Sequence, residues 1–419
     1  MIKDILKKII LEYQEFVTGI KLIPRKYNIE SLASYIIVGP RRSGKTYFLY
    51  QIIQDMIRKG RKQEDILYIN FEDERLMELK FTDLDTIVEV YKELYTRRPV
   101  FFFDEIQNVE GWEKFLRRLA DQKYRIYVSG SNAKLLSKEM ASVLGGRFLI
   151  LEMHNLSFRE YLFFNKVALE DNFEYTEQRF DIIAQFREYL EYGAFPEVIN
   201  FKNKKAYLSN LFQKVFYGDV MSRHRIRNEY GLKLMIKKIA ESTTDETSFT
   251  RIRNLIKAAG VDIGTATLIE YFNYLEEGFL AYSLQNFALK FAERETKKKF
   301  YFVDTGFLNL FLFEYDDKLL ENLVFLELKR RYGDDIFYFR EKLETDFYLP
   351  QQEQAIQVSY SLSRQESLKR ELLGLKATLK SRNLKEGIIL TYNEEKKITQ
   401  DGFKIQIIPV WKWMLKYGG

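Results

Sequence analysis

The feature that most constrains the fold of this chain is a glycine-rich octapeptide between an apolar run and a helix-forming stretch. The apolar run at residues 35–38 is typical of a buried strand. The pattern G-x-x-x-x-G-K-[ST] in this context is typical of a loop whose backbone amides face phosphate groups at a helix N-terminus. The sequence therefore predicts a parallel α/β sheet with a phosphate-binding loop. The loop residues are Gly39, Pro40, Arg41, Arg42, Ser43, Gly44, Lys45 and Thr46.

Two acids complete the predicted site. Lys45 is expected to neutralise phosphate oxygens, and the Thr46 hydroxyl to bind Mg²⁺. Asp104 and Glu105 end the apolar run 100–103. We expect Asp104 to hold Mg²⁺ with Thr46, and Glu105 to orient or deprotonate an attacking water. The ligands predicted here are ATP and Mg²⁺. The competing interpretations are a glycine-rich turn without a ligand and a helix cap.

Two further polar positions are candidates for catalysis. Asn132 follows the apolar run 124–128, so its amide could reach between the γ-phosphate and the water, whereas a simple turn is the alternative. Arg147 follows two glycines and could stabilise transition-state charge, either within the chain or from a neighbouring copy. A solvated surface arginine is the competing interpretation.

Composition narrows the class of protein. The 419 residues include no cysteine and only two histidines, which argues against disulfides and a structural zinc site. No apolar run approaches the ~20 residues of a membrane span, so a cytoplasmic protein without membrane contact is expected. The formal net charge of +6 permits nucleic-acid binding without requiring it.

The chain divides into three segments by pattern. Residues 1–155 alternate apolar runs with helical stretches, as in a parallel α/β sheet. Residues 156–298 are almost wholly helical in period, and residues 299–419 return to strand-like runs around two helices, 319–331 and 364–381. The strand-like runs lie near residues 34–39, 66–71, 99–105, 124–131, 298–306, 335–340, 345–350, 354–360, 386–392 and 403–411.

The order of the motifs resembles that of archaeal and bacterial AAA+ superfamily ATPases that carry a C-terminal domain of unknown function. The resemblance rests on GPRRSGKT, FFFDEIQNVEGWEKFLRRL, YVSGSNAKLL, GGRFLILEMHNLSFREYL, YLEYGAFPEVI, YFVDTGFLNLF and the closing IIPVWKWML, which together cover nearly the whole chain. It implies ATP hydrolysis, a winged-helix segment after the ATPase core and a C-terminal fold similar to PD-(D/E)xK nucleases.

The segment 250–280 has the proportions of a helix-turn-helix, with Thr265 or Thr267 near the start of its second helix. Such modules bind either DNA or proteins. Arg223, Arg225 and Arg227 lie just upstream and could contact phosphate or form a solvated face.

A nuclease of the type implied needs two carboxylates for a divalent metal and a lysine to position hydroxide. Glu327 and Asp346 fit the first positions, but Gln357 and Ser359 stand where an acid and the lysine are expected. This departure predicts a degenerate nuclease site without activity.

Three functions follow as hypotheses: an ATP-driven enzyme acting on DNA, a nucleotide-dependent switch that binds a protein partner, or an Mg²⁺-dependent nuclease. Homo-oligomerisation is possible, since AAA+ relatives often place the site at subunit boundaries.

Overall fold

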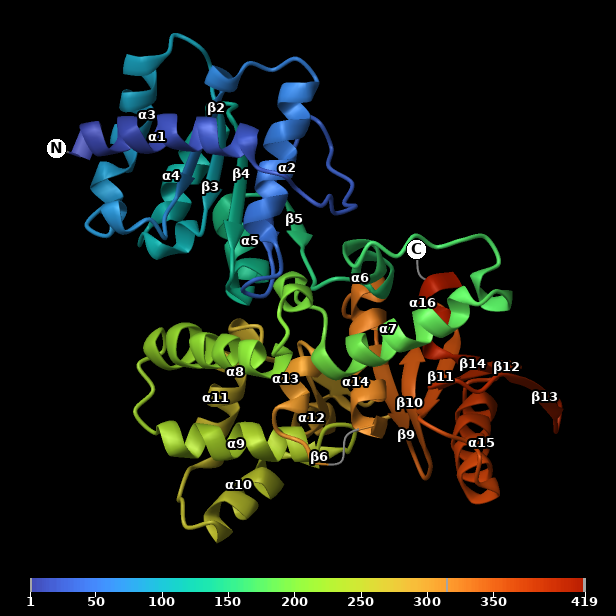
Figure 1. Ribbon diagram of the computed structural model, residues 1–419. Helices are drawn as coiled ribbons and strands as arrows, with labels where there is room; N and C mark the ends of the chain where they lie inside the picture. Colours follow the sequence, from blue (N-terminus) through green and yellow to red (C-terminus); the bar gives the residue numbers. More distant parts are fainter. Residues whose placement is uncertain (1, 314–315, 417–419) are drawn as a thin grey trace. The chain divides into compact units, whose positions relative to one another are not determined.

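The computed structural model describes residues 2–313 and 316–416, which fall into two compact units, Met1–His154 and Asn155–Gly419 (Figure 1). The first unit matches the expected α/β segment. The second contains both the helical segment and the C-terminal strands. The expected boundary at residue 298 lies inside strand β8 (Lys297–Phe302), which pairs with strands on its N-terminal side.

The first unit is built on five parallel strands in the order β2-β3-β4-β1-β5. This confirms the predicted parallel sheet and four of its strands. The fifth was absent from the predicted runs, although four of its five residues are apolar; it lies at the sheet edge, where Leu149 and Ile150 are 44% and 42% exposed. The strands are β1 (Ser34–Val38), β2 (Ile66–Asn70), β3 (Val100–Asp104), β4 (Arg125–Gly130) and β5 (Phe148–Glu152).

Helices pack on this sheet, and the side chains between them form the hydrophobic core. Phe48 and Ile53 of one helix pack with Tyr35 and Ile37 of β1, and all four side chains are buried. This apolar layer fixes the helix that follows the glycine-rich loop. The helices are α1 (Ile2–Gly19), α2 (Lys45–Arg58), α3 (Leu84–Leu94), α4 (Trp112–Asp121) and α5 (Lys138–Leu144).

The second unit begins with helices and a three-stranded antiparallel sheet, β6-β8-β7. The predicted second helix of the helix-turn-helix segment starts at Thr265, as expected. The elements are α6 (Phe158–Phe164), α7 (Gln178–Tyr192), α8 (Lys204–Lys214), the π-helix η8 (Val215–Ser222), α9 (Glu229–Glu241), β6 (Thr247–Ser248), α10 (Phe249–Ala258), α11 (Thr265–Glu277), β7 (Ala281–Gln285), α12 (Phe291–Thr296), β8 and α13 (Thr305–Asn309).

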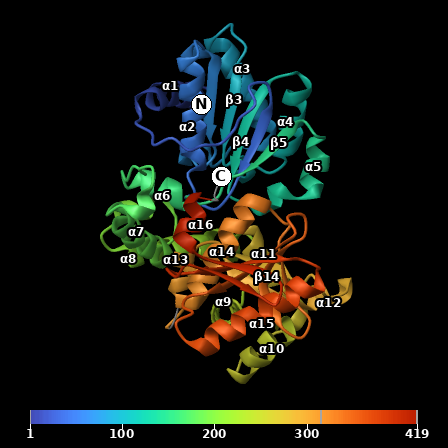
Figure 2. The same ribbon diagram turned by 90° about the vertical axis from the view of Figure 1, so that its right-hand side faces the viewer.

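A six-stranded mixed sheet follows, in the order β13-β14-β12-β11-β10-β9. Figure 2 shows the helices α14 and α15 beside its strands, and both contact β11. The pairing of β10 with β9 shifts register between Thr345 and Tyr348, an irregularity that includes Asp346. The elements are α14 (Asp316–Tyr332), β9 (Phe337–Arg340), β10 (Glu344–Leu349), β11 (Gln354–Ser359), α15 (Gln365–Ser381), β12 (Glu386–Thr391), β13 (Lys396–Gln400), β14 (Phe403–Pro409) and α16 (Val410–Lys416).

Candidate nucleotide site

The glycine-rich loop joins the end of β1 to the start of α2. Gly39 allows a close backbone approach, since a Cβ there would lie 2.0 Å from the Met153 carbonyl oxygen. Gly44 adopts φ +98° at the N-cap of α2, a conformation that favours glycine. The Ser43 hydroxyl is buried and has no hydrogen-bond partner among the described residues. A buried, unsatisfied donor at a helix N-terminus fits an anion such as a phosphate group.

Lys45 points back into the loop. Its side chain is only 3% exposed, and its Nζ donates to the carbonyl oxygens of Gly39 at 3.1 Å and Pro40 at 2.9 Å. The same Nζ lies 3.7 Å from Glu105 Oε1. The ammonium group therefore lies between the loop backbone and the acid that follows β3, where it can neutralise phosphate oxygens.

Asp104 ends strand β3 and is almost fully buried. Its carboxylate accepts hydrogen bonds from the hydroxyls of Tyr68 at 2.7 Å, Ser129 and Thr46. Burial and then the charge of Glu105 raise the pKa of Asp104 above its usual value. The two oxygen ligands predicted for Mg²⁺, on Thr46 and Asp104, therefore lie in contact, so the residues present fit a hard cation.

Glu105 has a left-handed backbone, with φ 52°. Its Oε2 accepts from the Ser131 amide at 3.2 Å, the Ser131 hydroxyl at 3.0 Å and the Gln107 amide. Burial alone would raise the pKa of Glu105, but Lys45 and these hydrogen bonds together lower it. Glu105 is therefore held as a carboxylate that can accept a proton.

The structure does not bring the Asn132 amide to the acids. Asn132 Oδ1 instead accepts from the Lys134 amide at 2.8 Å and caps the following turn. The polar groups that reach the acids from the end of β4 are the hydroxyls of Ser129 and Ser131. The Asn132 oxygen already accepts a hydrogen bond from the backbone of the turn, so the side chain points along the turn and not toward the acids.

The structure places Arg147 at the start of the strands, whereas the glycine-rich loop follows the end of β1. Arg147 immediately precedes β5, whose first residue pairs with Ser34, the first residue of β1. The loop residues follow the other end of β1. The Arg147 Nε donates to Asp121 Oδ1 at 2.6 Å. The interpretation in which Arg147 acts within its own chain is therefore not supported by this geometry, and supply to a neighbouring copy remains a proposal.

Two residues that sequence reasoning missed also contact the site. Tyr68 on β2 reaches Asp104, as described above. Arg25, only 5% exposed, donates from Nη1 to the Ser43 carbonyl at 3.0 Å and from Nη2 to the His154 carbonyl at 3.1 Å. No motif signals either residue, because both contacts depend on the folded arrangement of segments far apart in sequence.

Of the three predicted nuclease residues, only two lie together. Asp346 and Gln357 lie together on adjacent strands, where the Asp346 amide donates to Gln357 Oε1 at 3.3 Å. Glu327 is not with them: it pairs with Arg331 at 2.8 Å. The acid of α14 beside Asp346 is Glu321. Six residues change the helical face and shift the position by ~9 Å, so assigning Glu327 to this cluster was wrong.

Comparison with known proteins identifies a known domain and two related proteins. A family model described as an AAA domain matches residues 33–162, and one described as a domain of unknown function (DUF8612) matches residues 183–317. An uncharacterized protein of Methanocaldococcus jannaschii is 35% identical, over 99% of this chain and 96% of its own length. An uncharacterized protein of Haemophilus influenzae is 29% identical, over 91% of this chain and 94% of its own.

Among solved structures, a Walker-type ATPase of Pyrococcus abyssi aligns with a TM-score of 0.40 and 12% identity, over 74% of this chain and 95% of that one. A likeness at this level carries no functional information. The sheet, the loop and the AAA-domain match define the class of protein as an AAA-type P-loop ATPase fold. Within that class, the chain belongs to the same family as the Methanocaldococcus jannaschii protein.

Among the helices in the described parts of the chain, none combines the length and apolar character needed to cross a membrane.

Proposed function

We propose that this protein binds ATP with Mg²⁺ and hydrolyses it to ADP and phosphate. The observation that carries this proposal is the convergence at one loop of Lys45, the Thr46–Asp104 contact and Glu105, whose Oε1 lies 3.7 Å from Lys45 Nζ. Loop amides and Lys45 bind the phosphates, while Thr46 and Asp104 would hold Mg²⁺, which would neutralise charge on the phosphate oxygens.

Glu105 then acts on the attacking water. It orients the water and accepts its proton as the oxygen bonds to the γ-phosphorus, while the bond from that phosphorus to the bridging oxygen breaks. Ser131 and Gln107 fix the direction of the Glu105 carboxylate by their hydrogen bonds. The low pKa of Glu105 keeps it deprotonated before each turnover.

The substitution Glu105→Gln separates binding from hydrolysis. It retains the shape and removes the proton acceptor, so we expect turnover to fall about 10²–10⁴-fold with ATP affinity largely retained. The matched control is Glu110→Gln, which changes an exposed acid six residues from Asp104 in the sequence. Unchanged turnover in Glu105→Gln would exclude Glu105 as the base.

We propose further that the ATPase works in association with DNA, through a winged helix formed by α9 to β8. The net charge of +6 and the exposed Arg251 and Lys257 of α10 favour this. The second helix, α11, does not contribute, because Thr265–Glu277 contains three glutamates and no lysine or arginine. Contact with phosphates is therefore assigned to α10 and not to α11.

The test is the ATPase rate with and without duplex or single-stranded DNA at low and moderate salt. The proposal expects stimulation that weakens with salt and is reduced in Arg251→Glu with Lys257→Glu, but not in the control Lys404→Glu. A rate that DNA leaves unchanged would favour instead the nucleotide-dependent switch that binds a protein. Such a switch needs no cations on α11, whose exposed residues include Ile269 and Glu270.

A further inference from the structure

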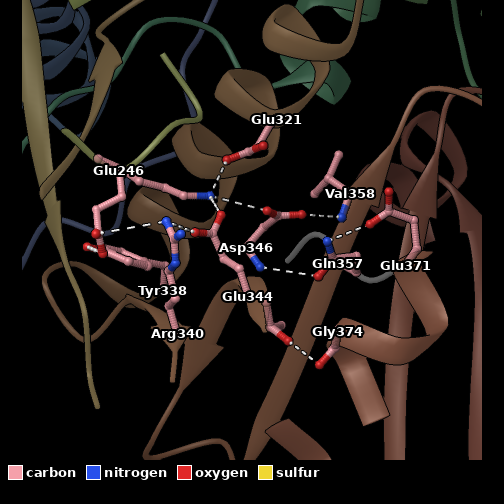
Figure 3. Close-up of polar contacts among 12 residues, drawn as sticks. Glu246, Glu321, Tyr338, Arg340, Glu344, Asp346, Gln357, Val358, Glu371 and Gly374 are labelled. Atoms are coloured by element: carbon pink, nitrogen blue, oxygen red, sulfur yellow. Dashed lines mark hydrogen bonds and ion pairs between the residues drawn. The ribbon is translucent and has the colours of Figure 1, made fainter. Parts of the chain in front are cut away.

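The C-terminal unit contains a buried charge cluster far from the glycine-rich loop in sequence. Figure 3 shows Glu321, Glu344 and Asp346 converging, from α14 and β10. Glu321 and Asp346 are each less than one-tenth exposed. Three carboxylates gathered in a buried site must be neutralised by protonation or by a cation, because unpaired buried charge is costly.

The neutralising group is Lys299 of β8. Its side chain is fully buried, and its Nζ lies 2.7 Å from Glu344 Oε1, 3.2 Å from Glu321 Oε1 and 3.2 Å from Asp346 Oδ1. Burial alone would lower the pKa of Lys299, but the surrounding groups raise it well above its usual value, so the side chain is an ammonium ion. A positive charge therefore lies where the three carboxylates meet.

The remaining polar atoms around the cluster also form hydrogen bonds within the protein. The second oxygen of Asp346, Oδ2, accepts from the Val358 amide at 2.9 Å. Gln357 Nε2 donates to Glu371 Oε2 at 2.7 Å, and the other Glu371 oxygen accepts from Arg370. These bonds pair the second Asp346 oxygen, the Gln357 amide and both Glu371 oxygens with other protein groups.

The cluster does not fit the divalent metal that a PD-(D/E)xK-like fold implies. A metal held by Glu321 and Asp346 would lie beside the Lys299 ammonium, and two cations at that spacing repel strongly in a buried site. Ser359 replaces the expected lysine, and its hydroxyl donates to the Ser361 carbonyl at 3.2 Å. Among the described residues, no group of three or more His, Cys, Asp or Glu side chains is arranged to hold a metal ion.

We propose that Lys299 is a built-in cation that takes the place of the metal in this nuclease-like domain. The domain is then inactive as a nuclease, and its acids serve to bind β8 to the six-stranded sheet. Lys299 lies in β8, between β6 and β7, whereas Asp346 and Glu344 lie in β10 of the other sheet. The ion cluster thus joins the three-stranded sheet to the C-terminal sheet. This inference does not depend on ATP hydrolysis.

The experiment uses Mn²⁺ as the probe on the full chain without nucleotide. We expect Lys299→Ala to lower the melting temperature and to expose an acidic site, so that millimolar Mn²⁺ restores several degrees, on the order expected for ligand binding to the folded state. The double variant Lys299→Ala, Asp346→Asn should lose this restoration. Lys298→Ala, on the same strand, is the matched control and should gain no response to Mn²⁺.

The wild type supplies an independent test that does not require Lys299→Ala to fold. Mn²⁺ binding measured by paramagnetic resonance should be equal in wild type and Asp346→Asn, because Asp346 already pairs with Lys299. Plasmid DNA with Mg²⁺ or Mn²⁺ should remain uncut by both proteins. Mn²⁺ binding or cleavage that Asp346→Asn abolishes would overturn the proposal, as would a folded Lys299→Ala that gains no response to Mn²⁺.

Discussion

Tyr68 contacts the proposed metal ligand Asp104 from the neighbouring strand β2. Its hydroxyl donates to Asp104 Oδ2 at 2.7 Å in a buried setting, and Tyr50 is its neighbour at 3.3 Å between hydroxyls. A group that hydrogen-bonds a metal ligand orients it and favours its charged form. Tyr68 is therefore a positioning residue, because it acts through Asp104.

The substitution Tyr68→Phe retains the ring and removes this donor. The pKa of Asp104, already raised by burial, should rise further, so more Mg²⁺ should be needed for half-maximal ATPase activity, by about 10-fold. The measurement is an Mg²⁺ titration of the rate. Tyr50→Phe is the control, because the Tyr50 hydroxyl contacts Tyr68 and not Asp104. Equal Mg²⁺ requirements in all three proteins would show that the contact is only structural.

Glu321 makes stability depend on pH. Burial and then the charge of Asp346 raise the pKa of Glu321 from 4.5 to about 8. The folded protein thus retains a proton that the unfolded chain releases near pH 4.5. The stability from this group is full below that pH and is lost as pH rises through about 8.

In Glu321→Gln this loss should disappear, since the neutral amide can accept the hydrogen bonds from Tyr301 and Lys299. Denaturant unfolding near pH ~5 and ~9 measures the change in the free energy of unfolding. The wild type should lose a few kcal/mol more than the variant across this range. If the free energies of unfolding of the two proteins differ by the same amount at both pH values, Glu321 is ionised across the whole range.

The residues that sequence could assign are those whose chemistry is local. Lys45, Thr46, Asp104 and Glu105 each lie within a few residues of a strand end, so the motif itself places them near one another. Tyr68 and Lys299 could not be assigned, because they belong to no motif, and their partners Asp104 and Asp346 are 36 and 47 residues away. Their roles depend on which strands become neighbours, and no pattern within one strand encodes that.

At the scale of elements, the loop between β1 and α2 is held by its close approach to the segment after β5. Met153 donates from its amide to the Val38 carbonyl at 2.6 Å, and its own carbonyl lies where a Cβ of residue 39 would be. Arg25 binds the same loop from the other side, at the Ser43 carbonyl. The conformation of the loop is therefore set by packing as well as by its glycines.

The substitution Gly39→Ala should displace the loop, because backbone atoms at 2.0 Å cannot move aside like a flexible side chain. We expect ATP affinity to fall at least ~10-fold and the melting temperature to fall by several degrees, since overpacking costs about 1–3 kcal/mol. Gly19→Ala, where nothing lies within 4 Å, is the control for the loss of a glycine. Normal ATP binding by Gly39→Ala would contradict this account of the loop.

Apolar periodicity predicted where helices and strands lie more reliably than which elements pack against each other. The helices expected at 319–331 and 364–381 correspond to α14 and α15. The assignment of Glu327 failed because α14 is buried on several faces, so apolar spacing does not reveal which side meets the sheet. Likewise, only residues 298–302 of the run at 298–306 are in a strand, β8, and the pairing of β8 with β7 was not visible in its composition.

At the scale of the whole molecule, the two compact units divide the chemistry. Met1–His154 contains the nucleotide site, and Asn155–Gly419 contains the α10 cations and the Lys299 cluster. The proposed function requires only the first unit to bind ATP, whereas DNA association requires the second. If DNA does not stimulate the ATPase, the proposal of DNA association fails, but the proposal of ATP binding and hydrolysis still stands.

The most direct measurement is equilibrium binding of ATP in the presence of Mg²⁺ to wild type, Lys45→Ala and the exposed control Lys59→Ala. The account predicts saturable binding by wild type and Lys59→Ala, weakened at least ~10-fold in Lys45→Ala by the loss of a charge-assisted phosphate contact. Absence of ATP binding by the wild type, or equal binding by Lys45→Ala, would contradict it.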